Sequence, residues 1–587
     1  MTPTQNSTLT ARAASYAPSR DRLARTVADL CALGEKVSGT PEEQQACDYL
    51  TAQLRAMGVS YKVHRFDSYI SYPTATTLTL LVPEARDIPA VGVAFTRDTG
   101  AAGIEADIVW AGAGGPEQYA DLDARGKIAL IDKLPTYGLC EAARKAGAAA
   151  LVGMSSGPQR HKMTCSPIWG APASKAEVDA MPAIAGASIN RPDGEWLRQL
   201  AQRGGARGRL VARVDTRWRE VLLPVAEIPG TEPEFLLMGA HYCTWFDGAT
   251  DNIGAVAILL ELARLFQGRA TPPRHGIRLA WWPGHTHGRY AGSAWYADEF
   301  WHELNDRAIA YFNVDINGSR RAYNKALRNQ TGEAAAYTAA VMRDVLGEID
   351  PDQAASMQAC LRRPERYVHH TRPHRASDQS FWGVGLSGLQ VSSFLQKDDP
   401  DRLPNSGLAR WWHAEEDTVE NCDPDVLLED ARLHAQLVHG LVDAAVLPLD
   451  LLGIAGDVDD ALREYAEAAP ELRLLDEIAA AVQRFRGAAQ RFHAAGARLD
   501  PADTAATAAW NRRLLRAIHG VNPAVYLLGS PFQQDRATGS RLLPGFKPLL
   551  DWQALSTDER RMLRVALRRE VNRLVHALDE ARRVIET

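Results

Sequence analysis

The stretch Gly239–Phe266, GAHYCTWFDGATDNIGAVAILLELARLF, joins two features that decide the fold. It completes the apolar run FLLMGAH, and its second half repeats apolar residues at helical spacing. Three further short apolar runs, HGIRLAWWP, AIAYFNVD and SGLQVSS, are separated from one another by helical segments. This alternation predicts an α/β fold, with buried strands of a mainly parallel sheet flanked by helices.

Four polar residues stand where these elements begin or end. His241 ends the run FLLMGAH, and Asp251 lies just before the helical segment. Asp315 ends AIAYFNVD, and His413 lies in WWHAEEDT after another strand-rich stretch. In open α/β sheets, ligands gather outside the carboxyl ends of the strands, so these positions fit one site. Two imidazoles and two carboxylates suit zinc or another first-row divalent metal.

The 587 residues divide into regions of different texture. Residues 1–102 read as helices followed by a strand and form the first part of the main domain. Short strands broken by Gly and Pro over 103–220 predict an inserted module. The main domain resumes over 221–454, and 455–587 reads as long helices rich in Ala, Leu, Arg and Glu, an all-α region.

Composition limits the partners that the chain can have. The net charge of -6 and the pI near 6.3 give no electrostatic reason to bind nucleic acid or an anionic membrane. No run approaches the ~18 apolar residues of a membrane helix, and the polar start lacks the apolar stretch of a secretory signal. The seven cysteines are scattered, without the spacing of a disulfide framework or a paired-cysteine zinc site. We therefore expect a cytoplasmic, reduced protein.

The segment 239–266 resembles the start of the metal site in zinc peptidases related to glutamate carboxypeptidase, the transferrin receptor and bacterial leucine aminopeptidases. In that family a His, a bridging Asp, a Glu pair, a second Asp and a final His hold two zinc ions. The phrases LDARGKIALID, KAGAAALV and MPAIAGASI resemble a protease-associated domain. The terminal helices resemble the dimerisation region of the transferrin receptor group, which implies a homodimer formed through them.

The sequence departs from this family at its catalytic carboxylates. The family phrase His-x-Asp, whose Asp orients the first His, has Cys243 in place of the Asp. The family's Glu pair, a general base followed by a ligand, falls within WWPGHTHGRYAGS. Depending on the alignment, the pair becomes Thr286-His287 or His285-Thr286, and neither choice restores a carboxylate.

The replacement changes both the charge and the proton chemistry of the site. Only Asp251 and Asp315 remain to balance divalent cations, which favours one metal, or two with an anionic ligand. If the phrase HTH is extended, His285 and His287 point to one face and both reach one metal, and which of them is the ligand stays open. His285 and Cys243 are the candidates for proton transfer. The predicted metal ligands are His241, Asp251, His287, Asp315 and His413.

The phrase VHHTRPHRASDQSFW corresponds to a Ser-Asp region beside the family's substrate pocket. The resemblance therefore implies that Arg375 and Asp378 contact the substrate. A solvated loop with a helix cap is the alternative interpretation of the same phrase.

Three functions remain open from the sequence. The first is a metal-dependent hydrolase of a peptide, amide or other C–N bond in a small substrate, with zinc as the expected metal. The second is a non-hydrolytic or redox enzyme on the same scaffold, with iron, manganese or copper. The third is a binding protein without catalysis, as the transferrin receptor is within its group.

Overall fold

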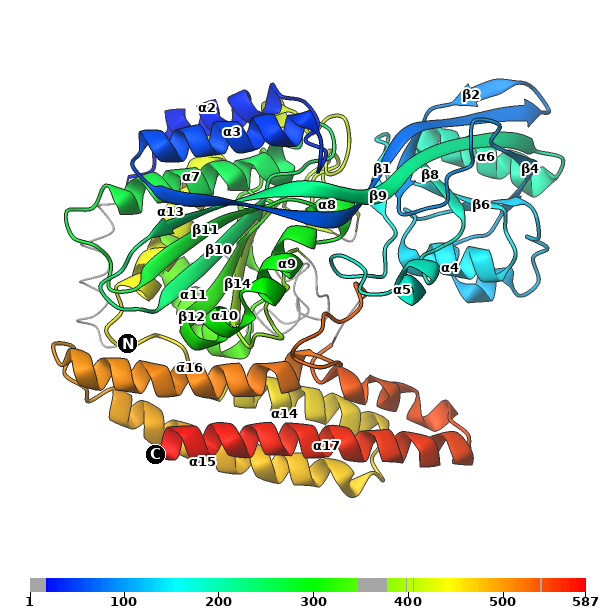
Figure 1. Cartoon of the computed structure of the whole chain (residues 1–587). Helices are drawn as coiled ribbons and strands as arrows, with labels where there is room; N and C mark the ends of the chain where they lie inside the picture. Colours follow the sequence, from blue (N-terminus) through cyan, green and yellow to red (C-terminus); the bar gives the residue numbers. More distant parts are fainter. Residues whose placement is uncertain (1–16, 347–376, 397, 405, 539–540) are drawn as a thin grey trace.

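The computed structural model describes residues 17–346, 377–396, 398–404, 406–538 and 541–587. Figure 1 shows three parts: a sheet with helices on both faces, a smaller lobe joined to it by long strands, and a layer of long C-terminal helices.

Four parallel strands form the centre of the main sheet. In order across it they are β14 (Ser387–Phe394), β12 (Ala308–Val314), β10 (Phe235–His241) and β11 (Gly276–Trp282). Every residue of β10, β12 and β14 is buried, as parallel strands are when helices cover both faces of the sheet. Antiparallel strands β13 (Asn324–Leu327) and β9 (Arg207–Ile228) flank the group. The predicted mainly parallel, mixed α/β sheet is confirmed.

Helices cover both faces of this sheet (Figure 1). One face carries α7 (Gly254–Gln267), α13 (Pro424–Val442), α2 (Arg20–Cys31) and α3 (Pro41–Ala56). The other face carries α9 (Ala291–Glu299) and α10 (Trp301–Arg307), while α11 (Gly332–Leu346) packs beside α13 on the first face. Every residue from Gly254 to Ala263 of α7 is buried, because this helix lies between the sheet and the outer helices α2 and α3.

Two long strands join the main sheet to the smaller lobe. β1 (Ser60–Val82) pairs antiparallel with β9 from Ser60↔Glu227 to Val82↔Arg207. β9 also pairs with β11 in the main sheet and with β4 in the lobe, so one hydrogen-bonded ladder runs through both parts. The lobe strands are β2 (Arg86–Ile88), β3 (Ala90–Ala94), β4 (Ile104–Trp110), β5 (Ile128–Ile131), β6 (Ala150–Met154), β7 (Met163–Thr164) and β8 (Ala185–Ile189).

The lobe has its own small core around the parallel strands β4, β5, β6 and β8. Its helices are α4 (Tyr137–Lys145), α5 (Lys175–Asp179) and α6 (Arg191–Arg203). β2 and β3 already belong to the lobe, ahead of the boundary expected at residue 103. That the lobe is a protease-associated domain stays a prediction.

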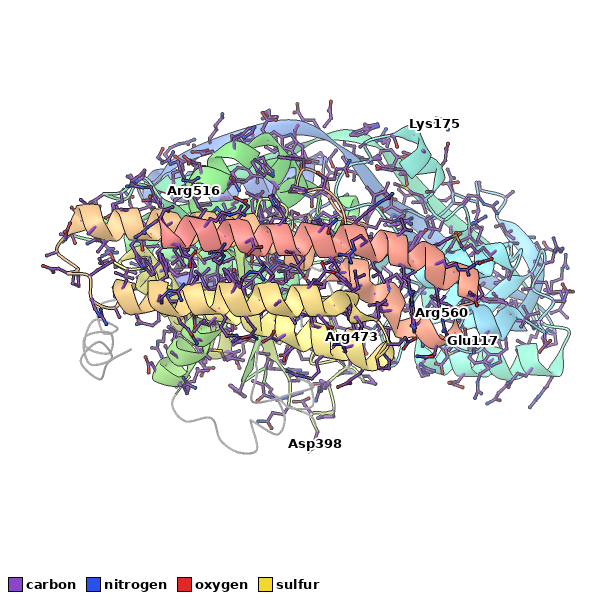
Figure 2. The ribbon with its side chains drawn as sticks, turned by 90° about the horizontal axis from the view of Figure 1, so that it is seen from below. Glu117, Lys175, Asp398, Arg473, Arg516 and Arg560 are labelled. Carbon is purple, nitrogen blue, oxygen red and sulfur yellow. The ribbon has the colours of Figure 1, made fainter. Side chains whose placement is uncertain are left out.

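The C-terminal helices lie side by side beneath the sheet domain (Figures 1 and 2). They are α14 (Leu451–Ala468), α15 (Asp476–Gly496), α16 (Thr504–Tyr526) and α17 (Thr557–Glu586). α16 continues through Pro523 and ends at Tyr526, well before α17 begins at Thr557. Among the described residues, no helix has both the length and the apolar character needed to cross a membrane.

Most of the apolar surface of these helices is covered within the chain. Leu567, Val571, Leu574 and Leu578 of α17 are buried, and α17 packs against α15 and α16. On the first turns of α17, Met562 and Val565 stay 66% and 56% exposed. The homodimer through these helices stays a prediction.

Glu43 in α3 is a buried carboxylate that links three segments of the main domain. Its Oε2 accepts hydrogen bonds from the backbone N–H groups of Gly39 (3.1 Å) and Leu222 (3.3 Å), while Oε1 has no hydrogen-bond partner. Burial raises the pKa of Glu43 from about 4.5 to about 8. The folded protein therefore keeps this carboxyl protonated at neutral pH, whereas the unfolded chain releases the proton.

We expect Glu43→Gln to flatten the pH dependence of stability. Because the pKa is raised in the folded state, the stability contribution is complete below about pH 4.5 and is lost as pH rises towards 8. Each pKa unit corresponds to about 1.4 kcal/mol, so wild type should lose a few kcal/mol between pH 5 and pH 9 that the glutamine variant keeps. Thermal denaturation at pH 5, 7 and 9 measures this, with Glu42→Gln as the neighbouring control. Equal slopes in wild type and Glu43→Gln would contradict the expectation.

Candidate metal centre

Asp251 lies between two histidines at the carboxyl end of the main sheet. Its Oδ1 is 3.1 Å from His241 Nε2, and its Oδ2 is 3.2 Å from His413 Nε2. Asp315 follows β12 directly, and its Oδ1 is 3.5 Å from His241 Nε2. Three of these four residues are buried, and the His413 side chain is 15% exposed. The structure thus brings together all four residues that the sequence placed at one edge of the sheet.

Backbone carbonyls decide which ring nitrogen of each histidine carries the proton. His241 Nδ1 lies 2.8 Å from the carbonyl of Cys243, and His413 Nδ1 lies 2.9 Å from the carbonyl of Lys162. A carbonyl only accepts, so both Nδ1 atoms donate. In the neutral rings the two Nε2 atoms then carry lone pairs that face carboxylate oxygens. An arrangement in which only electron-pair donors face one another requires a positive charge between them.

The effect of the two carboxylates on the pKa of His241 also indicates that the site favours a positive charge. Burial disfavours a charged His241, yet the carboxylates of Asp251 and Asp315 outweigh burial and raise the pKa of His241 well above its ordinary value. The Asp315 Oδ1 atom is buried without a hydrogen-bond partner. A divalent cation satisfies these groups better than a proton does, so the residues present fit a metal ion.

His285 approaches the same cluster from the next strand connection. It begins α8 (His285–Gly288), a single helical turn after β11. The His285 ring stacks on His241 at 3.8 Å between ring centroids with 18° between the planes. Ligand atoms of His241, His285 and Asp315 lie within 4.8 Å of one another. The site therefore holds three histidines and two aspartates.

The phrase HTH is helical, so the condition under which both histidines would reach one metal is not met. Gly284 (φ 65°) and Arg289 (φ 52°) take left-handed conformations on either side of the phrase and set it as one helical turn. Successive side chains then point in different directions, and His287 turns towards Trp245, with 4.5 Å between ring centroids. Its Nδ1 lies 3.1 Å from Thr286 Oγ1. His285, and not His287, is grouped with His241 and Asp315.

Asp378 holds His285 in place. Its Oδ2 accepts from His285 Nδ1 at 2.7 Å, and its Oδ1 accepts from Ser293 Oγ at 2.7 Å. Asp378 is 1% exposed, so both carboxylate oxygens are directed to protein partners. Its role as a substrate contact stays a prediction. Arg375, the other predicted contact, lies outside the described residues.

Cys243 lies beneath the helical turn. Its Sγ accepts from the backbone N–H of His285 at 3.2 Å and from Thr286 Oγ1 at 3.5 Å. Burial opposes its ionisation, but His241 and His287 together lower the pKa of this thiol well below its ordinary value. Cys243 is fully buried and is not among the residues that line the cavity described next.

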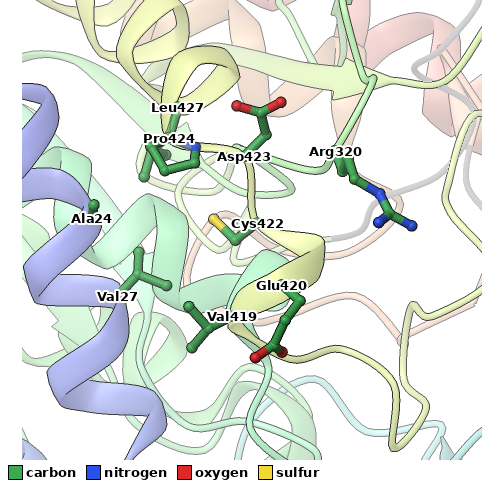
Figure 3. A pocket seen from close by; sticks show the side chains of 9 residues that line it. All are labelled: Ala24, Val27, Arg320, Val419, Glu420, Cys422, Asp423, Pro424 and Leu427. Atoms are coloured by element: carbon green, nitrogen blue, oxygen red, sulfur yellow. The ribbon is translucent and has the colours of Figure 1, made fainter.

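A cavity of about 180 Å³ opens onto the cluster. Its floor includes Asp251, His285, Asp315 and His413. Its wall includes Arg289, Arg328, Tyr290, Trp412 and, from the smaller lobe, Met163 and Thr164. A larger cavity of about 310 Å³, between α2 and the start of α13, is lined mainly by apolar side chains and lacks the histidine cluster (Figure 3).

The smaller lobe contributes directly to the metal centre. Lys162, next to β7, exchanges two hydrogen bonds with His413: its N–H donates to the His413 carbonyl at 3.0 Å, and its carbonyl accepts from Nδ1. The Lys162 ammonium forms a largely buried ion pair with Glu35, which also accepts from Tyr72 Oη at 2.6 Å. Burial alone raises the pKa of Glu35, but Lys162 and Tyr72 outweigh it and lower the pKa overall. The lobe is thereby fixed to the loop that carries His413.

Asp417 is a site residue that the sequence interpretation missed. Its oxygens accept from the N–H groups of Thr250 (2.9 Å) and Asp251 (3.0 Å) and from Thr250 Oγ1 (2.8 Å). Burial raises the pKa of Asp417 to about 7. Its position four residues after His413 in WWHAEEDT was the available signal. Asp417 holds the backbone that presents Asp251.

Comparisons with known proteins match parts of this chain. Residues 225–438 match Peptidase family M28. The part of the chain that carries the candidate metal centre therefore matches a peptidase family M28 domain. A probable glutamate carboxypeptidase of Zea mays is 27% identical over 372 residues, which is 51% of this chain and 52% of that protein. Transferrin receptor protein 2 of Rattus norvegicus is 24% identical over 244 residues, 39% of this chain and 29% of the receptor.

This chain also has neighbours among solved structures. A zinc aminopeptidase from Bacillus subtilis superposes with a TM-score of 0.56 at 21% identity, covering 73% of this chain and 96% of that one. An M28 peptidase precursor from Shewanella amazonensis superposes with a TM-score of 0.56 at 19% identity, covering 76% and 97% of the two chains. These likenesses establish the fold. The chain spans about half the length, or less, of the curated relatives named above.

We expect Asp251→Ala to release the metal held by this cluster. The variant removes both oxygens that stand between His241 and His413, and metal content should fall by one or two equivalents relative to wild type. Thermal stability in the presence of zinc should fall with it, because a ligand that binds only the folded state stabilises it. Elemental analysis after dialysis measures the change. A second variant, Asp417→Asn, should have a smaller effect and reduce the affinity for the metal roughly 10–100-fold. Metal content equal to wild type in Asp251→Ala would refute the assignment.

Proposed function

We propose that this chain is a metal-dependent hydrolase that cleaves a peptide, amide or other C–N bond in a small substrate. The observation that carries the proposal is that the Nε2 atoms of His241 and His413 both face the carboxylate of Asp251, which lines the cavity together with His413. The M28 domain supports the same reaction class.

His241, Asp251, Asp315 and His413 would hold the cation, and their nitrogen and oxygen donors favour zinc. When bound, a divalent cation polarises a substrate carbonyl and lowers the pKa of water. The chain supplies two ligand carboxylates for this charge. That number favours one ion, or two ions together with an anionic substrate.

In this proposal His285 replaces the carboxylate that accepts the proton. The Asp378 carboxylate accepts from His285 Nδ1, so the unprotonated nitrogen of the neutral ring is Nε2. Nε2 takes a proton from the attacking water and passes it to the nitrogen of the bond that breaks. Asp378 acts as a positioning residue, because it fixes the ring orientation and tautomer from outside the reacting atoms. Thr286 has no comparable role, since a hydroxyl does not titrate near neutrality.

Two guanidinium groups in the cavity wall indicate that the substrate is acidic. Arg289 and Arg328 both line the cavity beside the cluster. Arg289 Nη2 donates to the carbonyl of Ala537 at 3.2 Å, which steadies it next to Tyr290. Guanidinium groups bind carboxylates through paired hydrogen bonds, so a substrate with a free carboxylate close to the scissile bond fits this wall.

A second candidate function follows from the donor group itself. His241, His285 and Asp315 form a set of two histidines and one carboxylate, which is the ligand set of many non-haem iron oxygenases. A redox enzyme on this scaffold would bind iron and change its absorption or paramagnetic spectrum when substrate is added. Metal identity after anaerobic purification separates the two candidates.

For the hydrolase, we expect turnover of dipeptides and N-acyl amino acids that carry Asp or Glu, and loss of that turnover with a chelator. Neutral dipeptides and aminoacyl anilides should be negligible substrates, since the usual carboxylate base is replaced and the cavity wall is cationic. Product analysis by chromatography on a matched panel, with and without chelator and added zinc, measures this. Efficient, chelator-sensitive cleavage of the neutral anilides would show that the replacement has no catalytic consequence.

His285→Ala should lower kcat roughly 10²–10⁴-fold, the usual effect of removing a general acid–base, while bound metal is retained. Asp378→Asn should give a smaller loss of kcat, because the ring remains but is less firmly held. The matched control is His287→Gln in the same helical turn, which faces Trp245 and should keep most activity and metal. If His287→Gln loses metal and His285→Ala does not lose activity, the roles of the two histidines are reversed.

A further inference from the structure

A second group of side chains of the metal-ligand type lies at the amino ends of the parallel strands, whereas the cluster around His241 lies at their carboxyl ends. Glu232 and Glu234 precede β10, and His275 precedes β11. β10 is seven residues long, so this group lies about 23 Å from the cluster around His241 at a rise of about 3.3 Å per residue. One ligand atom from each of the three residues lies within 4.8 Å of the other two.

The three facing atoms are buried and unpaired. His275 Nδ1 is 3.8 Å from Glu232 Oε2 and 3.8 Å from Glu234 Oε2. His275 is 0% exposed and Glu234 is 4% exposed. None of these three atoms has a hydrogen-bond partner. Buried polar atoms are rarely left unsatisfied, because each costs about 1–3 kcal/mol, so three that converge on one point require an explanation.

The hydrogen bond on the far side of the ring fixes the charge pattern. His275 Nε2 lies 3.2 Å from the carbonyl of Ala444, which can only accept, so Nε2 carries the proton. In the neutral ring the lone pair is therefore on Nδ1. That lone pair faces two carboxylate oxygens. A proton cannot bridge 3.8 Å as a hydrogen bond, whereas ligand atoms on one tetrahedral zinc lie about 3.4 Å apart.

The backbone holds the three residues in this arrangement. The N–H of Glu232 donates to the Arg274 carbonyl at 2.8 Å, and the N–H of Gly276 donates to the Glu234 carbonyl at 2.8 Å. The N–H of His275 donates to the Val442 carbonyl at 2.8 Å. The Arg274 guanidinium binds Glu232 through Oε1 at 2.6 Å and leaves Oε2 directed at His275. Arg274 balances one carboxylate, and the other remains to balance a cation.

We propose that Glu232, Glu234 and His275 form a second divalent-metal site, of structural rather than catalytic kind. Two carboxylate oxygens and one imidazole nitrogen suit zinc or a neighbouring first-row cation, with water completing the coordination. The site joins the loops before β10 and β11 to the connection between α13 and α14, through the Ala444 carbonyl. A cation there would fasten the main sheet to the C-terminal helices.

Zinc titration by calorimetry, with elemental analysis of the dialysed protein, tests the proposal. His275→Gln and Glu234→Gln should each bind one zinc equivalent fewer than wild type, and Asp251→Ala should retain that equivalent. His519→Gln is the matched control, because it is a buried histidine whose Nδ1 donates to a backbone carbonyl, that of Asn305, and it should bind as wild type. Unchanged zinc binding in both His275→Gln and Glu234→Gln would overturn the proposal.

A measurement on wild type covers the case in which these variants do not fold. Crystals of the full chain soaked in zinc chloride should show an anomalous peak between the Glu232, Glu234 and His275 side chains. The absence of a peak there, with zinc present at His241 and Asp251, would overturn the second site and leave the proposed function intact. A peak at the second site without one at His241 would support the second site and contradict the metal centre of the proposed function.

Discussion

Three hydrogen bonds at histidine Nδ1 atoms determine what the metal centre can do. The acceptors are the carbonyls of Cys243 and Lys162 and the carboxylate of Asp378, and they come from three different parts of the chain. Each bond fixes one tautomer, which leaves the lone pair of the neutral ring on Nε2. Without them the same side chains would be free to turn, and their nitrogens would not converge on Asp251 and Asp315.

The fold supplies these acceptors through its parallel strands. β10 and β12 end side by side, so His241 and Asp315 emerge next to each other. Asp417 then holds the turn that carries Asp251, and Ser293 holds Asp378. Removing one ligand side chain removes one ligand of the cation. Shifting β10 against β12 would move His241 away from Asp315 and so disrupt the whole group of ligands.

Much of this could be predicted from the sequence, because it depends on local pattern. Apolar runs with polar residues at their ends predicted the buried strands and the positions of His241, Asp251, Asp315 and His413. The direction of His285 and His287 could not be predicted in the same way, since it depends on left-handed backbone at Gly284 and Arg289. Arginine gives no sequence signal for such a conformation. The continuation of α16 through Pro523 depends on tertiary packing that outweighs the local preference of proline.

The pairing of His413 with Lys162 has a consequence for how the two parts of the molecule communicate. His413 belongs to the metal centre, but its orientation is set by a carbonyl of the smaller lobe. Free energies around a closed thermodynamic cycle sum to zero, so if docking of the lobe strengthens metal binding, metal binding strengthens docking of the lobe by the same factor. Under that condition the lobe and a bound cation would act as mutual effectors, and metal supply would change the rigidity of the junction between the two parts.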